Sequence, residues 1–550
     1  MDVTHKRSYL LGFTALYWLS ALLGWWVAYE ALSAQIRLLL LSVGAATVVV
    51  SGVLNRYQRL RLAPIAAGSA TIIASAFAAY YLLRQQFAHD AMAGIIGSTL
   101  AVLFPLGLGA VVWAHHAKQR IMSIVFAALS LLCLAGLIAT GERGAWLSLL
   151  AGVLVAAAFG LWHRSPALSK QGLVLDWLFW ISGSLLLLGY LAFLRVPAVA
   201  AWVMGALKLS PQSDLFTRWE LWNNSLTLLA DYPFTGSGLA APKMVLATYV
   251  YINHVASQPH VHNLYLQAGA EQGWLGLVAI AGMVIMALAL ALESLQSRNT
   301  ELLGLRLASL ASIVTLAIYG LLDAEIYAYA TAPLAFVPIA FTLLVRKSAR
   351  VHQTAHAAQH HGMARTEQRD TSFGQVAFST VALAVIFGAV WVNWEGFRAA
   401  IFTNLGTVSQ TRSELSVYQW PEWGIQDQLR QIEGGVDLNE AERYLRVALV
   451  FNPQNETSLR RFGQIALARG QFEKAESLLN DALRVAPNRR ATRQMLGELL
   501  AIRGETEQAV AMWQSVRLLD GQIDGRIWWY EQMGNKKAVD NIRLVQSQLN

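Results

Sequence analysis

The sequence predicts an all-α protein, in which a polytopic transmembrane helical bundle of about eleven spans precedes a soluble C-terminal domain of helical repeats. Apolar residues make up 55% of the 550 positions and charged residues only 14%, whereas a soluble protein has about 25% charged residues. Mean hydropathy is +0.41 and the pI is near 9.5. Because the Lys and Arg residues concentrate in short loops between apolar runs, membrane topology explains the basic pI and nucleic-acid binding is not expected.

Eleven apolar runs are long enough to cross a bilayer, which takes roughly 20 mostly apolar residues. The first is too long for a cleaved signal peptide and is followed by further spans. The single cysteine, Cys133, lies in one of these runs, so an internal disulfide framework is excluded. The expected spans are residues 10–29, 36–54, 62–83, 92–113, 121–139, 144–162, 175–195, 274–293, 303–322, 328–346 and 376–394.

Basic residues predict the orientation of the bundle. Sixteen Lys and Arg residues fall in one set of alternate loops, and only Arg37, Arg84 and Arg143 fall in the short loops of the other set. The positive-inside rule therefore predicts a cytoplasmic N-terminus and an outer C-terminus. The spans and this orientation together predict a membrane domain (1–394) with a long outer loop (196–262), and an outer helical domain (395–550). A basic, His-rich cytoplasmic linker (347–375) precedes the last span.

An internal repeat of 34 residues follows the last span. Its landmarks are small residues and prolines: Ala441, Ala475 and Ala509; Ala448 and Ala482; Pro453 and Pro487; Gly463 and Gly497; Gly470 and Gly504. This period resembles that of tetratricopeptide repeats, in which small residues let paired helices approach closely and proline ends the second helix. About two and a half repeats are visible, so residues 400–438 should form an atypical cap or a linker. Such arrays commonly bind protein partners.

The long outer loop carries the residues best suited to chemistry. Within it, Arg218 and Trp222 come first and the turn-like run Asp231-Tyr-Pro-Phe-Thr-Gly-Ser-Gly follows. The loop closes with His260-Val-His262-Asn263. One helix from 262 to 293 would measure about 47 Å, at 1.5 Å per residue, which exceeds the bilayer core. We therefore expect a break at Gly273, preceded by a short helix at 262–271 that lies at the outer surface or dips into the membrane.

On that short helix, Asn263, Gln267 and Glu271 recur every four residues and form a polar stripe. Polar groups at this depth must face other helices or a water-filled cavity.

Each candidate also has a purely structural interpretation. His262 could be an interfacial histidine, Arg218 could pair with Glu220 or lipid headgroups, and Arg143 could be a plain loop charge or pair with Glu142. Two further groups are interpreted structurally. Asp323 and Glu325 form a short acidic outer loop, which is more often topological than catalytic, and His352, His356 and His360 could form a metal-binding face but lie in the cytoplasmic linker, where a solvated role is expected.

Four motifs on one membrane face together resemble a known family. They are Gly141-Glu-Arg-Gly-Ala-Trp146, Arg218-x-x-x-Trp222, Asp231-Tyr-Pro-Phe-Thr-Gly-Ser-Gly238, and His262-Asn-Leu-Tyr-Leu-Gln267 with Glu271-Gln-Gly-Trp-Leu-Gly276. Their order is similar to that in the bacterial O-antigen ligase superfamily, which also contains protein O-oligosaccharyltransferases and Wzy-type polysaccharide polymerases. The similarity covers about residues 10–394 and leaves the repeats outside.

The resemblance implies a C-type glycosyltransferase-like fold in the bacterial inner membrane. Such enzymes move a glycan en bloc from undecaprenyl pyrophosphate to an acceptor hydroxyl at the periplasmic face, with inversion and without a metal or other cofactor. Guanidinium groups suit a pyrophosphate leaving group, so Arg218 and Arg143 would bind it. A histidine that titrates near neutrality suits the general base, and His262 is the candidate because it precedes asparagine in the motif. His260, Asn263 and Glu271 would bind or orient the substrate.

Three functions remain open at this level. The first is a ligase acting on lipid A–core sugar or protein Ser/Thr, and the second is a Wzy-type polymerase whose acceptor is another lipid-linked repeat unit. The third is a transporter or assembly scaffold for envelope polysaccharide. The scarcity of charge in mid-span disfavours transport, and a scaffold would not need Arg143, Arg218 and His262 on one side. The acceptor, the glycan, the oligomeric state and the role of the repeats are not determined by the sequence.

Overall fold

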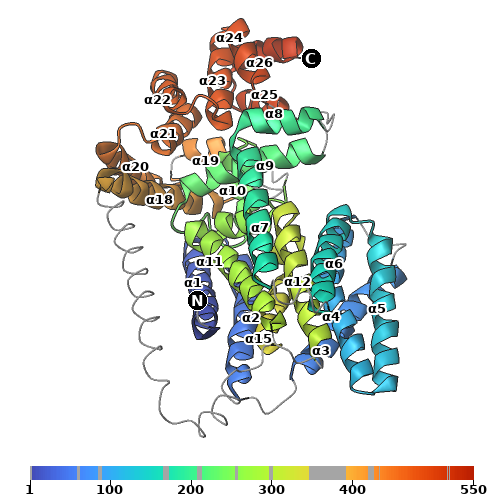
Figure 1. The fold of residues 1–550 in the computed structure, drawn as a ribbon. Helices are drawn as coiled ribbons and strands as arrows, with labels where there is room; N and C mark the ends of the chain where they lie inside the picture. The colour runs from blue at the N-terminus through green and yellow to red at the C-terminus, as the bar shows by residue number, and fades with distance from the viewer. Residues whose placement is uncertain are drawn as a thin grey trace.

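The structure is a computed structural model that describes residues 3–57, 62–84, 90–164, 172–206, 214–253, 258–296, 302–345, 392–418, 426–432, 434–516, 518 and 521–549. Within these residues all regular structure is helical (Figure 1). The expected all-α, polytopic fold class is confirmed.

Nine helices among the described residues are long and apolar enough to cross a membrane, and they coincide with the first nine expected spans. They are α1 (Val3–Val27), α2 (Ala31–Tyr57), α3 (Leu62–Arg84), α4 (Asp90–His116), α5 (Arg120–Thr140), α6 (Arg143–Arg164), α7 (Gly172–Arg195), α11 (Leu264–Leu295) and α12 (Leu303–Leu322).

The tenth expected span, 328–346, is not one long helix. It consists of α13 (Glu325–Ala328), α14 (Ala332–Ala335) and α15 (Val337–Leu344). Pro333 and Pro338 each lie in the first turn of a helix, where proline is tolerated but prevents the preceding helix from continuing. The eleventh expected span, 376–394, lies outside the described residues except for its last three positions. The linker at 347–375, with its histidines, also lies outside them.

Small residues allow the spans to pack closely. A side-chain carbon added at Gly152 of α6 would lie 2.3 Å from Thr315 Oγ1 of α12. One added at Gly109 of α4 would lie 2.6 Å from Ala308, which is also in α12. Such close approach is typical of helix contacts in lipid. Side chains such as Leu131, Leu147 and Leu186 are exposed on the outside of the bundle, as lipid contact requires.

The break expected in α11 is confirmed at Gly273, whose φ of 73° and ψ of −168° are not helical. This positive φ favours glycine. A side chain at the position would also approach the carbonyl oxygen of Pro233 to 2.7 Å. The turn that contains Pro233 packs into the break, and its carbonyl accepts a hydrogen bond of 2.9 Å from Trp274 N.

Three helices lie within the long loop expected at 196–262: α8 (Pro197–Ala206), α9 (Asp214–Asp231) and α10 (Pro242–Tyr249). The loop joins the bundle at the end where α1 and α12 finish. Leu239 N donates to Gly24 O of α1 at 3.0 Å, and Arg218 of α9 contacts Leu322 O, the last residue of α12. We call this end of the bundle the site end.

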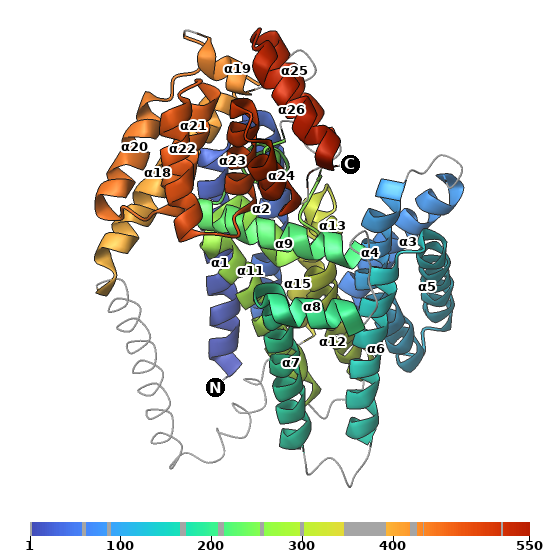
Figure 2. The ribbon, with the colours of Figure 1, turned by 90° about the horizontal axis from the view of Figure 1, so that it is seen from above.

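The C-terminal helical domain, residues 392–549, lies over the site end. It contains α18 (Trp394–Leu415), α19 (Gln426–Gln431), α20 (Asn439–Phe451), α21 (Glu456–Ala468), α22 (Phe472–Val485), α23 (Arg490–Arg503), α24 (Thr506–Gln514), α25 (Gln522–Gln532) and α26 (Lys536–Leu549). Figures 1 and 2 both show α9 between the membrane helices and this domain.

The 34-residue period corresponds to helix pairs. Pro453 and Pro487 follow the ends of α20 and α22. At the helix crossings, Gly463 packs against Leu479 and Gly497 against Trp513, and Gly406 of α18 packs against Leu445 in the same way. Residues expected as a cap or linker therefore include the end of a further paired helix, α18. Membership of the tetratricopeptide family stays a prediction.

Candidate active site

Three chain segments meet at the site end and bring titratable side chains together. α9 contributes Arg218, the segment before α11 contributes His260 and His262, and the turn after α12 contributes Asp323. Asp323 contacts all three of the other residues. Since the bundle fixes both α11 and α12, the spacing of these side chains is set by rigid elements.

His262 is held by Asp323. Its Nδ1 lies 3.1 and 3.2 Å from the two carboxylate oxygens. An ionised carboxylate can only accept, so Nδ1 carries a proton, and Nε2 presents a lone pair in the neutral form of the ring. That Nε2 makes no hydrogen bond to the residues described, and the side chain is 24% exposed. The arrangement leaves Nε2 open, so this nitrogen is positioned to exchange a proton with a bound group.

Asp323 stays ionised at neutral pH. Burial acts to raise its pKa, but the hydrogen bond and charge of His262, the Arg218 guanidinium and His260 together lower it to about 2. The carboxylate also accepts from the backbone N–H of Ala324 at 2.7 Å. Asp323 can therefore stabilise positive charge that develops on His262.

The backbone of His262 is strained. Its φ is +47°, a value uncommon for a residue with a side chain and costing on the order of 1–3 kcal/mol. Two contacts hold it: Trp222 Nε1 donates to His262 O at 2.9 Å, and His262 N donates to His260 Nδ1 at 3.2 Å. This backbone conformation directs the imidazole toward Asp323. Strained residues of this kind cluster at functional sites.

Asn263 has a structural part in the same turn. Its side-chain oxygen accepts from Leu266 N at 2.9 Å and caps the start of α11. Its amide donates to Tyr190 Oη at 2.8 Å and to Leu321 O at 3.1 Å. Asn263 thus joins the beginning of α11 to the end of α12.

Arg218 does not form the expected alternative pair with Glu220. Its Nη1 donates to Asp323 Oδ2 at 3.0 Å and to the carbonyl of Leu322, while Glu220 pairs with Arg490 at 2.6 Å. The other guanidinium nitrogens of Arg218 make no hydrogen bond to described residues, and the side chain is 30% exposed. They remain able to bind an anion.

His260 packs beside His262, with ring centroids 4.2 Å apart. Burial and the neighbouring His262 lower the pKa of His260 to about 4, although Asp323 acts to raise it. His260 is therefore neutral at physiological pH. It supports the His262 backbone without adding a competing positive charge.

Arg143 begins α6 and is exposed. It forms neither a hydrogen bond nor an ion pair with the described residues, so the alternative pair with Glu142 is not observed, whereas a plain loop charge agrees with this exposed position. The neighbouring Glu142 is close enough to raise the pKa of Glu325. This places the start of α6 beside the cluster.

Glu271 lies apart from the histidines. Its carboxylate pairs with Arg37 of α2 at 3.1 to 3.2 Å and accepts from Gln267 Nε2 at 3.0 Å. Arg37 is 5% and Glu271 2% exposed. The expected polar stripe is buried against neighbouring helices, and its Glu271 contributes a structural ion pair.

Glu325 lies 3.8 Å from His260 Nε2. Burial, then repulsion from Asp323 and Glu142, raises its pKa from 4.5 to about 8, while Arg218 acts to lower it. It is therefore a neutral carboxyl at physiological pH. The turn after α12 thus holds one ionised and one protonated carboxyl, which is a frequent arrangement at catalytic sites.

This raised pKa predicts a pH-dependent effect of Glu325→Gln. In the folded protein the carboxyl stays protonated until about pH 8, whereas in the unfolded chain it ionises from about pH 4.5. Folding stability is therefore lost as pH rises between these values. The variant should melt like wild type at pH 4.5 and roughly 1–3 °C higher at pH 8, by scanning fluorimetry in detergent. Equal melting temperatures at pH 8 would contradict the assignment.

His260, His262 and Asp323 could also hold a metal ion, because one ligand atom from each lies within 4.8 Å of the others. Two imidazoles and a carboxylate suit a transition metal such as Zn²⁺. Arg218, 3.0 Å from Asp323, would oppose the added positive charge.

Sequence pattern does not identify two charged residues as partners of the candidate site residues: Asp323, which pairs with His262, and Arg37, which pairs with Glu271. Asp323 was interpreted as topological, although a carboxylate directly after a span on the histidine side was a usable signal. Loop counting treats Arg37 only as a loop charge, although a lone arginine near the end of a span often indicates a buried partner.

The fold and this cluster define a multi-pass helical membrane protein with a His–Asp pair and arginines at one end of its bundle. Residues 128–281 match the model of a family described as O-Antigen ligase, which places this region in the O-antigen ligase superfamily. The matched region includes Arg143, Arg218 and His262, and Asp323 lies beyond it. The match supports a membrane glycan-transfer function of the O-antigen ligase type with a lipid-linked glycan as substrate. No curated protein matches the chain.

Proposed function

We propose that the protein is an inverting glycosyltransferase of the bacterial inner membrane. It transfers a glycan en bloc from undecaprenyl pyrophosphate to an acceptor hydroxyl, on lipid A–core sugar or on protein Ser/Thr, at the periplasmic face. The observation that carries the proposal is the open Nε2 of His262, whose Nδ1 is held by Asp323 at 3.1 Å beside Arg218.

The reaction forms one C–O bond and breaks another. The acceptor oxygen attacks the anomeric carbon opposite the pyrophosphate, and His262 Nε2 takes the hydroxyl proton. The imidazolium that results is stabilised by the Asp323 carboxylate at its Nδ1 side. The bond from the anomeric carbon to the pyrophosphate oxygen breaks with its electron pair, so the lipid leaves as the pyrophosphate anion and the anomeric centre is inverted.

Arginine side chains supply the positive charge that faces the pyrophosphate leaving group. The guanidinium nitrogens of Arg218 that are not bonded to Asp323 or Leu322 can bind one phosphate, and the exposed Arg143 can bind the other. Arginine forks bind phosphate oxygens with well-defined geometry. Fixed cations of this kind stabilise the charge that grows on the leaving oxygen.

Because arginines carry this charge, transfer should not require a metal. We expect full activity after extensive dialysis against a chelator. Added micromolar Zn²⁺ should inhibit reversibly, because it would take the nitrogen and oxygen atoms of His260, His262 and Asp323. The measurement is transfer of a lipid-linked glycan in detergent or proteoliposomes. Activity that is lost on chelation and restored by Mg²⁺ or Mn²⁺ would contradict this part of the proposal.

The acceptor is tested by deleting the gene in its host. Parallel blots of lipopolysaccharide, glycoprotein and capsule then report which pool loses its glycan. Loss from lipopolysaccharide or glycoprotein supports a ligase acting on that acceptor. Loss of long polysaccharide chains with intact single units indicates polymerisation, and loss of none argues against glycan transfer.

A further inference from the structure

The C-terminal helical domain has two layers of helices. Its inner layer is covered by the chain's own long loop at 196–262. The inner layer consists of α18, α21, α23 and α25. Every residue of α21, Glu456–Ala468, is buried, and α23 is buried from Arg490 to Ile502 apart from Arg493. Their outer partners are much more open: α22 buries only Ala475, Leu479 and Ala482.

One covering element is the segment 248–252, whose backbone carbonyls are bonded by inner-layer side chains. The donors and acceptors are Gln464 Nε2 to Thr248 O at 3.2 Å, Arg460 Nη1 to Tyr249 O at 3.2 Å, and Gln522 Nε2 to Tyr251 O at 2.7 Å and Ile252 O at 3.1 Å. Thr248 and Tyr249 end α10, and the last carbonyls of a helix have no partner within the helix, so these side chains satisfy them.

Two tyrosines of the segment are also bound. The Arg461 guanidinium lies 3.7 Å from the ring centroid of Tyr249, whose hydroxyl donates to Glu414 at 2.7 Å. The Arg490 guanidinium lies 4.8 Å from the ring of Tyr251. Both tyrosines are buried. Cation–π contacts of this kind strengthen when they are withdrawn from water.

The segment ends on strained backbone. Ile252 has φ of +50°, which is a genuine outlier for a β-branched residue. Such a conformation persists only where the surroundings over-determine it. Gln522 bonds the carbonyls of Tyr251 and of Ile252 itself, so the inner layer fixes the strained residue.

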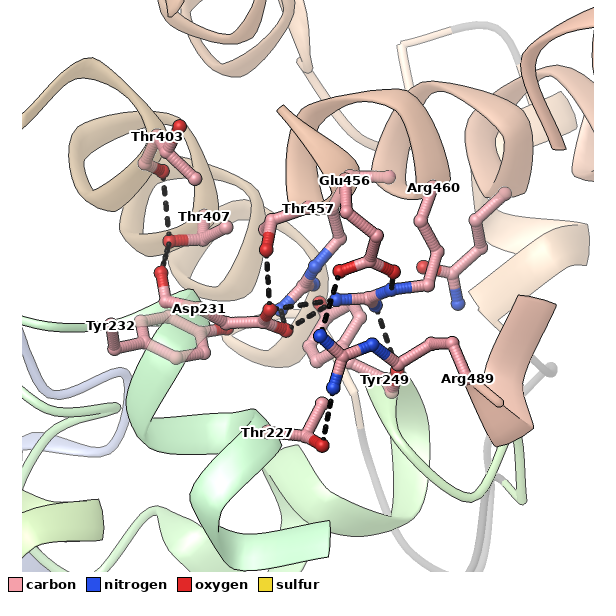
Figure 3. A network of polar contacts seen from close by, with 12 residues as sticks. Thr227, Asp231, Tyr232, Tyr249, Thr403, Thr407, Glu456, Thr457, Arg460 and Arg489 are labelled. Carbon is pink, nitrogen blue, oxygen red and sulfur yellow. Dashed lines mark hydrogen bonds and ion pairs between the residues drawn. The ribbon is translucent and has the colours of Figure 1, made fainter. Parts of the chain in front are cut away.

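The second covering element is α9, which is bonded along its length. Arg490 pairs with Glu220 at 2.6 Å and Arg489 Nη1 donates to Thr227 at 2.5 Å. At the end of the helix Asp231 receives two bonds of 2.7 Å from Arg460 (Figure 3).

α9 also leads directly to the site. It carries Arg218, which contacts Asp323, and Trp222, whose indole donates to His262 O at 2.9 Å. On the other covering element, Ile252 precedes His260 by only eight positions in the sequence. The inner layer therefore holds α9, which carries Arg218 and bonds His262 through Trp222, and a segment that ends eight positions before His260.

We propose that the C-terminal helical domain acts within its own chain as a clamp that positions Arg218, His260 and His262. The inner layer is occupied by residues 248–252 and by α9, so it is not a free surface for an acceptor. Arg460, Gln464 and Gln522 are positioning residues in this account, which rests on the proposed function of the site.

The first test is Gln522→Glu, which replaces the amide donor with a carboxylate facing two carbonyls. We expect hydrogen exchange of backbone amides in 246–263 to become at least about tenfold faster. The kcat of glycan transfer should fall about tenfold, because a small misplacement of reacting groups has effects of this size. KM for the lipid-linked glycan should stay within about twofold. The matched control is Arg543→Met, which breaks the exposed pair between Arg543 of α26 and Glu531 of α25 and should change neither quantity.

A charge exchange separates positioning from misfolding. Glu220→Arg places two cations together and should release α9, raising exchange and lowering kcat. The double variant Glu220→Arg with Arg490→Glu restores the pair and should recover most of kcat. Exchange in α26, away from the interface, reports whether the domain itself stays folded.

The outcomes distinguish this inference from the proposed function. Unchanged exchange in 246–263, or faster exchange with unchanged kcat, overturns the clamp. A rise only in KM for the acceptor overturns it in favour of acceptor binding at the inner layer. Full activity of His262→Ala would instead remove the proposed mechanism, while the exchange data would still report whether the loop is clamped.

Discussion

Replacing His262 with alanine should lower the rate of glycan transfer by roughly 10²- to 10⁴-fold, the usual contribution of a positioned general base. The variant removes the open Nε2 and leaves the Asp323 carboxylate paired with Arg218. Transfer of a lipid-linked glycan by purified protein in proteoliposomes is the measurement. Membrane insertion and melting temperature should match those of wild type.

Two further variants show whether the loss is due to the base. His262→Gln keeps a donor for Asp323 but has no basic nitrogen, so it should be about as inactive as the alanine variant. His115→Ala removes an exposed histidine in the last turn of α4, at the end of the bundle opposite the site end. This variant should transfer normally. Near wild-type transfer by His262→Ala would end the proposed mechanism.

Replacing Arg218 with alanine should lower kcat by roughly 10²- to 10³-fold, because it removes a fixed cation from the leaving group. It also leaves the buried Asp323 with less compensating charge, so its pKa should rise from about 2. Arg218→Lys keeps the charge without the planar fork and should recover only part of the activity. The assay is the same, with substrate concentration varied.

Arg195→Ala is the matched control for Arg218. Arg195 is exposed at the end of α7, on the same side of the bundle, and should be dispensable. If Arg218→Ala and Arg195→Ala lose activity equally, general surface charge explains the effect. A selective loss in Arg218→Ala supports binding of the pyrophosphate at this position.

Local pattern was sufficient for the helices. Hydropathy located nine spans that the structure describes as membrane-length helices, because a spanning helix must satisfy its own backbone and expose apolar side chains to lipid. The same reasoning failed at 328–346, since Pro333 and Pro338 interrupt the run. Average hydropathy does not register a missing backbone donor.

The candidate site was predictable only in part. Arg218 and His262 were found because their motifs are short and lie within one loop. Asp323, which binds both, is 61 positions from His262, and nothing in the local pattern links the two. For Glu271 the sequence indicated a buried polar stripe, but its partner Arg37 lies 234 positions away.

Local sequence pattern predicts the class of the fold, the break at Gly273, the period of the C-terminal helices, and Arg218 and His262 as candidate site residues. Each of these follows from a local requirement, such as hydrophobic length or permitted backbone angles. Three pairings depend on the tertiary structure: Asp323 with His262, Arg37 with Glu271, and Arg460 of the C-terminal domain with Asp231, 229 positions away. A buried charge must find a partner, but which partner it meets depends on how distant helix ends come together.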